Sequence, residues 1–156
     1  MRISDIDPNF RLSTNVPEDV KFRSVWEPPF RIYGIAENDP GDFCRLPRQM
    51  LPFCSAGIRR LSEYLAGACV RFSTDADSLA VLWELVTDAN MAHFAPCGKN
   101  GMELYEETEQ GTRHVANLIP ALEEGGPCRI KQSSFVRLPA GMHSYVLYLP
   151  LYNGLK

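Results

Sequence analysis

The chain has 156 residues, of which 45% are hydrophobic and 22% charged, and its formal net charge at pH 7 is −3. This length fits one domain with a hydrophobic core, and the composition is ordinary for a soluble globular protein. The small negative charge leaves no basic footprint, so we do not expect nucleic acid as a partner.

The N-terminal residues carry no targeting signal that we can identify. Residues 1–7 lack the continuous apolar stretch of a secretory signal, and no run in the chain is long enough to cross a bilayer. We therefore expect a soluble cytoplasmic protein with no membrane partner. Residues 1–20 contain two prolines and several Asp and Asn, which predicts an irregular lead-in with one edge strand near residues 10–12.

The cysteines and the known cofactor motifs argue against metal and nucleotide chemistry. An odd number of cysteines without a Cys-x-x-Cys pair favours free thiols over a disulfide framework or a zinc site. No nucleotide-binding loop, His-Glu-x-x-His or calcium loop occurs either, so we expect no cofactor and no metal. The five thiols are those of Cys44, Cys54, Cys69, Cys97 and Cys128.

The first half of the main domain mixes strands with one helix. Alternating apolar residues predict strands at 21–26 and 30–36, with two prolines between them, and residues 38–42 are a strong turn signal. Between residues 52 and 66, apolar side chains recur at helical spacing. Ser55 is the candidate N-cap of this helix and Gly67 its stop, and the chain offers no other helix candidate.

The second half of the chain is read as strands throughout. Ala68, Val70 and Phe72 share one face of a half-buried strand, whereas residues 79–86 are apolar on both faces, so we expect both faces to be covered. Further strands are expected at 101–107, 112–118, 128–132 and 144–149, with turns at 110–111, 125–127 and 139–141.

The number and spacing of these strands predict the fold class. Seven to nine short strands indicate an all-β protein, a jelly-roll-like antiparallel β-sandwich with one short helix. We expect residues 1–20 to be a lead-in and residues 21–156 to form the sandwich.

Several segments match a known module in order. Residues 101–105 read Gly-Met-Glu-Leu-Tyr, and residues 29–34, 43–47, 66–75, 91–98 and 147–154 accompany them. The pattern resembles the N-terminal β domain of bacterial SGNH (GDSL-type) esterases, whose signature is Gly-x-Asp-Leu-Tyr. The resemblance spans most of residues 29–154 and implies the same jelly-roll fold.

The resemblance also carries expectations about function. In that family the hydrolase domain begins just after the Leu-Pro-Leu-Tyr segment, and this chain ends at Lys156, so we expect the catalytic domain to be absent here. The implied role is a non-catalytic accessory domain that packs against the hydrolase domain of the same gene product and shapes its substrate cleft. The parent enzyme would hydrolyse carboxylic esters, such as acetyl groups on carbohydrates, through a serine and without metal.

The sequence offers no catalytic residue of its own. Ser78 lies in an Asp-Ser-Leu sequence, as in the family's Gly-Asp-Ser-Leu nucleophile block. The first position of that block is Ala76 here and not Gly, so we expect Ser78 to be a turn residue. A serine nucleophile needs a base and an acid in contact with it. None of the three histidines, His93, His114 and His143, lies in an Asp-x-x-His block, and we expect the last two at the surface.

The candidate site residues each have a functional and a structural interpretation. His93 either holds its loop or lines a cleft, and Glu103 either caps backbone N–H groups or faces solvent. Arg71 is expected to clamp Asp75 or Glu103. Aromatic rings could stack on sugars or pack in the core. The candidate cleft or interface residues are His93, Glu103, Tyr105, Tyr148 and Tyr152, and the motif residues with structural roles are Arg71, Asp75, Gly101 and Leu104.

A second function remains open at the sequence level. The chain could be a stand-alone jelly roll that binds carbohydrate or protein. Such a module could also form a homo-oligomer through an apolar face. An esterase activity of the chain itself would predict ester hydrolysis that vanishes on Ser78→Ala, and we expect no such activity. If a hydrolase domain covers one face instead, we expect Val146, Tyr148 and Tyr152 to be hidden by it.

Overall fold

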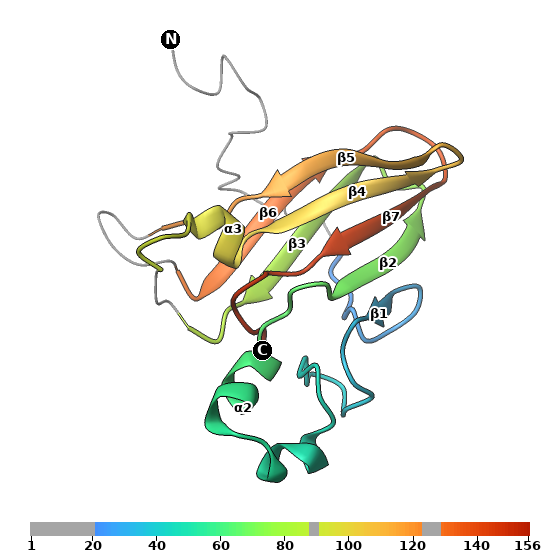
Figure 1. Cartoon of the computed structure of the whole chain (residues 1–156). Coiled ribbons are helices and arrows are strands. Elements are labelled where there is room, and N and C mark those ends of the chain that lie inside the picture. Colours follow the sequence, from blue (N-terminus) through green and yellow to red (C-terminus); the bar gives the residue numbers. More distant parts are fainter. Residues whose placement is uncertain (1–20, 88–90, 123–128) are drawn as a thin grey trace.

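The computed structural model describes residues 21–87, 91–122 and 129–156, and these form two antiparallel sheets. The larger sheet has the strand order β1-β2-β7-β4-β5, and the smaller one pairs β3 with β6. In Figure 1 the smaller sheet lies behind the larger one, so the two make the layers of a sandwich. The predicted all-β antiparallel sandwich is therefore confirmed. The strands are β1 (Arg31–Tyr33), β2 (Cys69–Thr74), β3 (Ser78–Glu84), β4 (Met102–Thr108), β5 (Gly111–Leu118), β6 (Lys131–Arg137) and β7 (His143–Tyr148).

The core fills the space between the sheets. Val70 and Phe72, which the sequence places on one face of β2, are both buried, and they pack with residues of β4 and β7. From β3, Trp83 enters this core with 7% exposure. Its neighbour Leu82 points the other way and is 54% exposed, so the prediction that both faces of residues 79–86 are covered is wrong.

The predicted short helix is present within residues 52–66. It is α2 (Ala56–Ser62), and the hydroxyl of Ser55 accepts a hydrogen bond from the backbone N–H of Ile58, as an N-cap should. The described residues also contain two elements that the sequence analysis did not predict, a 3₁₀ helix η2 (Arg48–Phe53) and a single-turn helix α3 (Pro96–Asn100).

Two predicted strands differ from the structure. Residues 21–26 form no strand: residues 21–24 are irregular and residues 25–26 lie in a turn, where Trp26 packs on Phe43 at a ring-centroid distance of 5.0 Å. The strand expected at 128–132 is β6, displaced toward the C-terminus. The predicted turns at 38–42 and 139–141 are present, with Gly41 and Gly141 at positive φ. Residues 1–20, the turn at 125–127 and Cys128 lie outside the described residues, as does the predicted edge strand.

The C-terminal segment, residues 151–156, is fixed between β3 and α3. Leu155 bridges to Leu85, and the backbone N–H of Lys156 donates to the carbonyl of Glu84 at 3.0 Å. Asn153 is fully buried, and its amide bonds to both the N–H and the C=O of Thr87 and to the side-chain oxygen of Asn100. This amide therefore ties the end of the chain to α3.

Among the residues described, no helix has the length and apolarity needed to span a bilayer.

Candidate functional site

The outward-facing side of the five-stranded sheet carries a continuous set of polar and aromatic side chains. Because side chains alternate along a strand, those that do not enter the core line up across this face. One row joins Arg71, Val146 and Tyr105, and the next joins Tyr148 and Glu103. We call this side the outer face.

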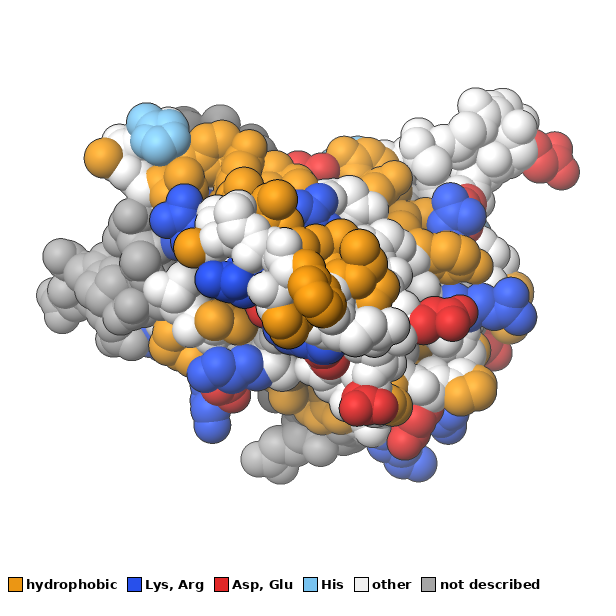
Figure 2. All heavy atoms as spheres, turned by 60° about the horizontal axis from the view of Figure 1, so that its bottom comes forward, with side chains coloured by type: hydrophobic (Ala, Val, Ile, Leu, Met, Phe, Trp, Pro, Cys, Tyr) orange, Lys and Arg blue, Asp and Glu red, His pale blue; other side chains and the backbone are white. Residues whose placement is uncertain are grey.

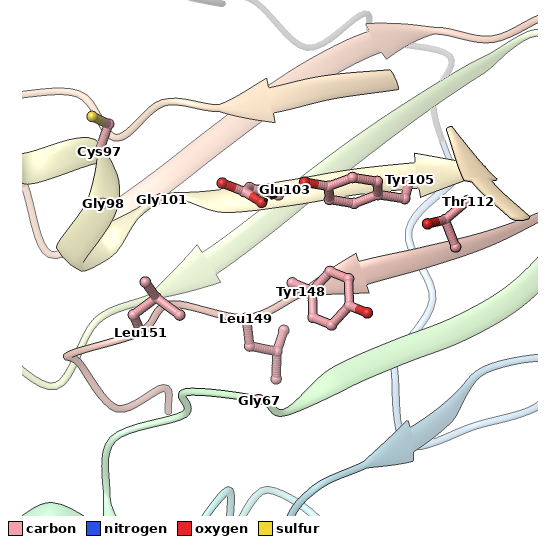
Figure 3. Close-up of a pocket in the computed structure, with 10 residues that line it drawn as sticks. All are labelled: Gly67, Cys97, Gly98, Gly101, Glu103, Tyr105, Thr112, Tyr148, Leu149 and Leu151. Atoms are coloured by element: carbon pink, nitrogen blue, oxygen red, sulfur yellow. Dashed lines mark hydrogen bonds between the residues drawn. The ribbon is translucent and has the colours of Figure 1, made fainter. Parts of the chain in front are cut away.

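A pocket of about 380 Å³ lies on the outer face where β4 and β7 meet α3 (Figure 3). We call it the outer-face pocket. Figure 3 shows the side chains of Glu103, Tyr105 and Tyr148 close together over the two central strands. Its lining residues are Gly67, Cys97, Gly98, Gly101, Glu103, Tyr105, Thr112, Tyr148, Leu149 and Leu151.

The aromatic rings in this pocket are held in a defined arrangement. The ring of Tyr105 makes edge-to-face contacts with Tyr148, at a centroid distance of 5.7 Å, and with His114 at 5.4 Å. Tyr148 keeps 38% of its surface exposed, so part of this residue is open to solvent. Aromatic rings can pack against apolar groups of a ligand.

A carboxylate stands beside these rings. The hydroxyl of Tyr105 donates to Oε2 of Glu103 at 2.9 Å, and this bond, followed by desolvation, raises the pKa of Tyr105. Glu103 itself is exposed, which agrees with the solvent-facing interpretation of this residue. The pair offers a ligand a carboxylate oxygen as acceptor.

The signature segment explains how the pocket is built. A Cβ added to Gly101 would lie 2.4 Å from the carbonyl oxygen of Cys97 and 3.0 Å from that of Leu118, so only glycine lets α3 approach the start of β4 this closely. Leu104 is fully buried and anchors β4 in the core. Glu103 and Tyr105, on either side of it, consequently face outward into the pocket.

Two predicted site residues lie away from this pocket. His93 is exposed in the loop before α3 and does not line the pocket. Tyr152 packs edge-to-face against Phe94 at 5.1 Å and against Tyr64 at 6.3 Å, and remains 38% exposed. Tyr152 therefore connects the loop before α3 with the segment after α2, instead of lining the pocket.

Arg71 has a different partner from the one expected. Its guanidinium lies 3.4 Å from Oε1 of Glu107 and 5.5 Å from the ring centroid of Tyr33, so the predicted clamp to Asp75 or Glu103 is wrong. Glu103 is engaged by the hydroxyl of Tyr105, and the long Arg71 side chain reaches across β7 to Glu107 on β4 instead. Asp75 is exposed just after β2.

The prediction that a partner domain hides the side chains of β7 also needs correction. Val146 was predicted to be hidden by a partner domain, but it is only 1% exposed within this chain. Its neighbours across the sheet, Arg71 and Tyr105, are long enough to cover it. Tyr148 is the residue of β7 that remains open.

Ser78 has the environment of a structural residue. It begins β3, and its hydroxyl donates to the adjacent carboxylate of Asp77 at 2.9 Å. This local bond orients no base toward the hydroxyl oxygen, which a nucleophilic serine requires. The described part of the chain also contains no group of three His, Cys, Asp or Glu side chains placed to hold a metal.

One cluster of charged residues was not found from the sequence. The carboxylate of Glu106, whose side chain is 7% exposed, accepts hydrogen bonds from Arg113 and from Nδ1 of His143, the latter at 2.6 Å. Nε2 of His143 faces the carbonyl oxygen of Ala140 at 3.2 Å. Arg113 and His143 lower the pKa of Glu106. We call these residues the Glu106 cluster.

The Glu106 cluster is suited to structure and not to acid–base catalysis. Both ring nitrogens of His143 face acceptors, so only the doubly protonated ring satisfies both bonds. Accordingly the Ala140 carbonyl, and then the Glu106 carboxylate, raise the pKa of His143. No ring nitrogen is left to act as a base. The two ends of the cluster are 37 residues apart in sequence, and no local pattern signals the contact.

The fold and site together define a class of protein: an antiparallel β-sandwich module with an aromatic pocket on one sheet. In the described residues, Ser78 and His114 bond to near neighbours in the sequence, His143 bonds to Glu106, and His93 is exposed. Comparison with family models makes the assignment specific. The chain belongs to the GxDLY family, the N-terminus of SGNH-hydrolase-type esterases, whose model matches residues 20–156.

A solved structure supports the fold. The chain is similar to a protein from Bacteroides ovatus described as a GDSL-like lipase, with a TM-score of 0.68 and 19% sequence identity. The similarity covers 81% of this chain and 36% of that one, so the chain spans about a third of the length of that protein. A comparison with curated proteins gave no match.

Proposed function

We propose that the chain is the N-terminal accessory module of an SGNH-type esterase, in which it packs against the hydrolase domain and borders the substrate cleft. The observation that carries the proposal is the family membership of residues 20–156. In this role the chain supplies no nucleophile, and ester hydrolysis takes place on the hydrolase domain. The proposed substrates are carboxylic esters, among them acetylated carbohydrates.

The outer-face pocket gives the module a means of contacting a large substrate. The partly exposed Tyr148 and the carboxylate of Glu103 are the two features that sugar recognition combines, an apolar platform beside a hydrogen-bond acceptor. Neither group has to move to be reached, because both are partly exposed. We therefore assign them the role of positioning the carbohydrate part of the ester.

The test uses the full gene product and two substrates of different size. Tyr148→Ala should raise the KM for an acetylated oligosaccharide by about 2- to 12-fold, because removing one stacked ring costs about 0.5–1.5 kcal/mol. The kinetics on p-nitrophenyl acetate should not change, since this small ester does not extend to the module. Tyr33→Ala is the matched control, because Tyr33 is an exposed tyrosine of the same sheet outside the pocket.

The outcomes separate the roles. Equal effects of Tyr148→Ala and Tyr33→Ala on the oligosaccharide would contradict a role for the pocket. Loss of p-nitrophenyl acetate hydrolysis on Ser78→Ala would contradict the accessory role altogether, because it would place the nucleophile in this chain.

A stand-alone binding module is the second candidate, and the aromatic pocket is the observation that favours it. In this case the 156-residue chain alone binds a neutral oligosaccharide, and Tyr148→Ala abolishes the binding measured by calorimetry. Reading the gene beyond Lys156 discriminates the two candidates. A Gly-Asp-Ser block followed later by Asp-x-x-His favours the accessory module.

A further inference from the structure

The segment formed by η2 and α2 presents apolar side chains to solvent. Phe53 is 91% exposed, Met50 51%, Ile58 49% and Leu61 47%. No residue of η2 is buried, and Ser62 is the only buried residue of α2. Figure 2, which brings the bottom of Figure 1 forward, shows hydrophobic side chains gathered near the centre of this side, with charged side chains around them. We call these four residues the helical apolar surface.

Polar contacts, rather than burial in the core, hold this segment in place. Arg48 bonds to Asp42 through Nε at 2.6 Å and also pairs with Glu63. Arg45 donates to the carbonyl oxygen of Leu61 at 3.0 Å, and Arg59 donates to that of Cys54 at 2.7 Å. The apolar side chains are therefore held outward on a fixed backbone.

Such an arrangement is expected of a surface that another body covers. Single exposed apolar residues are normal, but a contiguous group rimmed by charge marks an interaction site. A side chain as large as phenylalanine that is almost fully exposed gains most from burial at the centre of an interface. The exposed Arg59 and Arg60 beside it suit a partner with acidic groups at the rim.

The position of the C-terminal segment identifies the partner. This segment passes the end of α2, where a Cβ on Gly154 would lie 3.0 Å from the carbonyl oxygen of Glu63. Tyr152 contacts Tyr64, which directly follows that residue. Figure 1 accordingly shows the C-terminus beside α2. The last residue is held beside Glu84 of β3, so a domain that continues the chain would emerge at this end of the molecule, between β3 and the end of α2.

We infer that the helical apolar surface is the docking site for the hydrolase domain of the same polypeptide, an inference that rests on the proposed function. Docking there leaves the outer-face pocket open at the border of the interface, because Gly67, Leu149 and Leu151 line the pocket at the same end of the sheet. The sandwich then contacts the hydrolase domain through its helices and the substrate through its strands.

Hydroxyl-radical footprinting tests the docking site, first in the wild-type protein and then in one variant. Met50 on the surface and Met142 away from it are exposed methionines, at 51% and 69%, and serve as a matched pair. Between the 156-residue chain and the full gene product, we expect oxidation of Met50 and Phe53 to slow by about tenfold or more, as at the centre of an interface. Oxidation of Met142 should stay constant. In the full gene product, Phe53→Asp should restore the reactivity of Met50.

Each other result overturns the inference in a distinguishable way. If Met50 stays reactive while another part of this chain becomes protected, the docking site is wrong and the packing of the two domains stands. If no part of this chain becomes protected, or if the gene encodes no hydrolase domain, both the docking site and the proposed function are wrong. If Met50 is already protected in a dimer of the 156-residue chain, detected by sedimentation and lost in Phe53→Asp, the occupant is a second copy.

Discussion

Replacing Gly101 by alanine tests how the signature segment builds the pocket. The added Cβ would lie 2.4 Å from the carbonyl oxygen of Cys97, where a relaxed contact needs about 3.5 Å. Both atoms in conflict belong to the backbone or are attached directly to it, so α3 or the start of β4 must shift by about 1 Å. Overpacking of this kind costs about 1–3 kcal/mol. In a chain of this size the melting temperature should fall by about 3–10 °C.

Gly57→Ala is the matched control, because it makes the same change in α2. The nearest atom to its new Cβ is Oγ of Ser55 at 3.9 Å, an ordinary contact, and alanine favours the helix by about 0.5–1 kcal/mol. Its melting temperature should stay constant or rise. Both variants are measured by calorimetry and by urea unfolding. Equal shifts in the two variants would refute the argument that Gly101 is needed for close approach of α3.

Three further variants address the remaining contacts. His143→Gln should lower the melting temperature most between about pH 5 and 6.5, and the difference from the wild type should shrink toward pH 9. The reason is that the pKa of His143 is raised in the folded state. Its protonation therefore stabilises the fold below the ordinary histidine pKa of about 6.5, and this stabilisation is lost as the pH rises through the folded pKa. A constant difference from pH 5 to 9 would contradict this. Glu103→Gln should lower the pKa of Tyr105 toward its ordinary value. NMR of the tyrosine ring measures this pKa, and Tyr105→Phe is the assignment control. An unchanged pKa would exclude the hydrogen bond between Tyr105 and Glu103 as the cause of the raised value. Asn153→Ala should cost about 2–3 kcal/mol in urea unfolding, because it removes one hydrogen bond to the buried Asn100 and two to the half-buried backbone of Thr87. A loss below about 0.5 kcal/mol would show that the amide does not hold the C-terminal segment.

Local patterns were sufficient where the structure is locally determined. The alternation of Val70 and Phe72 gave the buried face of β2, and Ser55 gave the start of α2. Local patterns failed where packing between distant segments determines the structure. The turn of α3 is too short to show helical periodicity and begins at Pro96, which reads as a turn. In β6 the inward positions include Gln132 and Ser134, so no apolar alternation marks its length.

The pocket was only half predictable for a related reason. The signature segment pointed to Glu103 and Tyr105, since they flank an apolar residue on one strand. That Tyr148 faces them depends on β7 lying between β2 and β4, a register set by the whole sheet. The sequence could not predict the exposure of Phe53 either. A helical apolar pattern predicts a face turned toward the core, whereas here the polar contacts of Arg48 fix the opposite orientation.

Separating these two surfaces gives each a distinct kinetic signature. A change in the pocket, such as Tyr148→Ala, removes a contact with the carbohydrate part of the substrate and leaves the domains together. A change in the helical apolar surface, such as Phe53→Asp, removes a contact between domains and leaves the pocket residues in place. The first should alter only the kinetics on large esters. The second should weaken domain packing first, and should alter large-ester kinetics only because the pocket is no longer held at the border of the cleft.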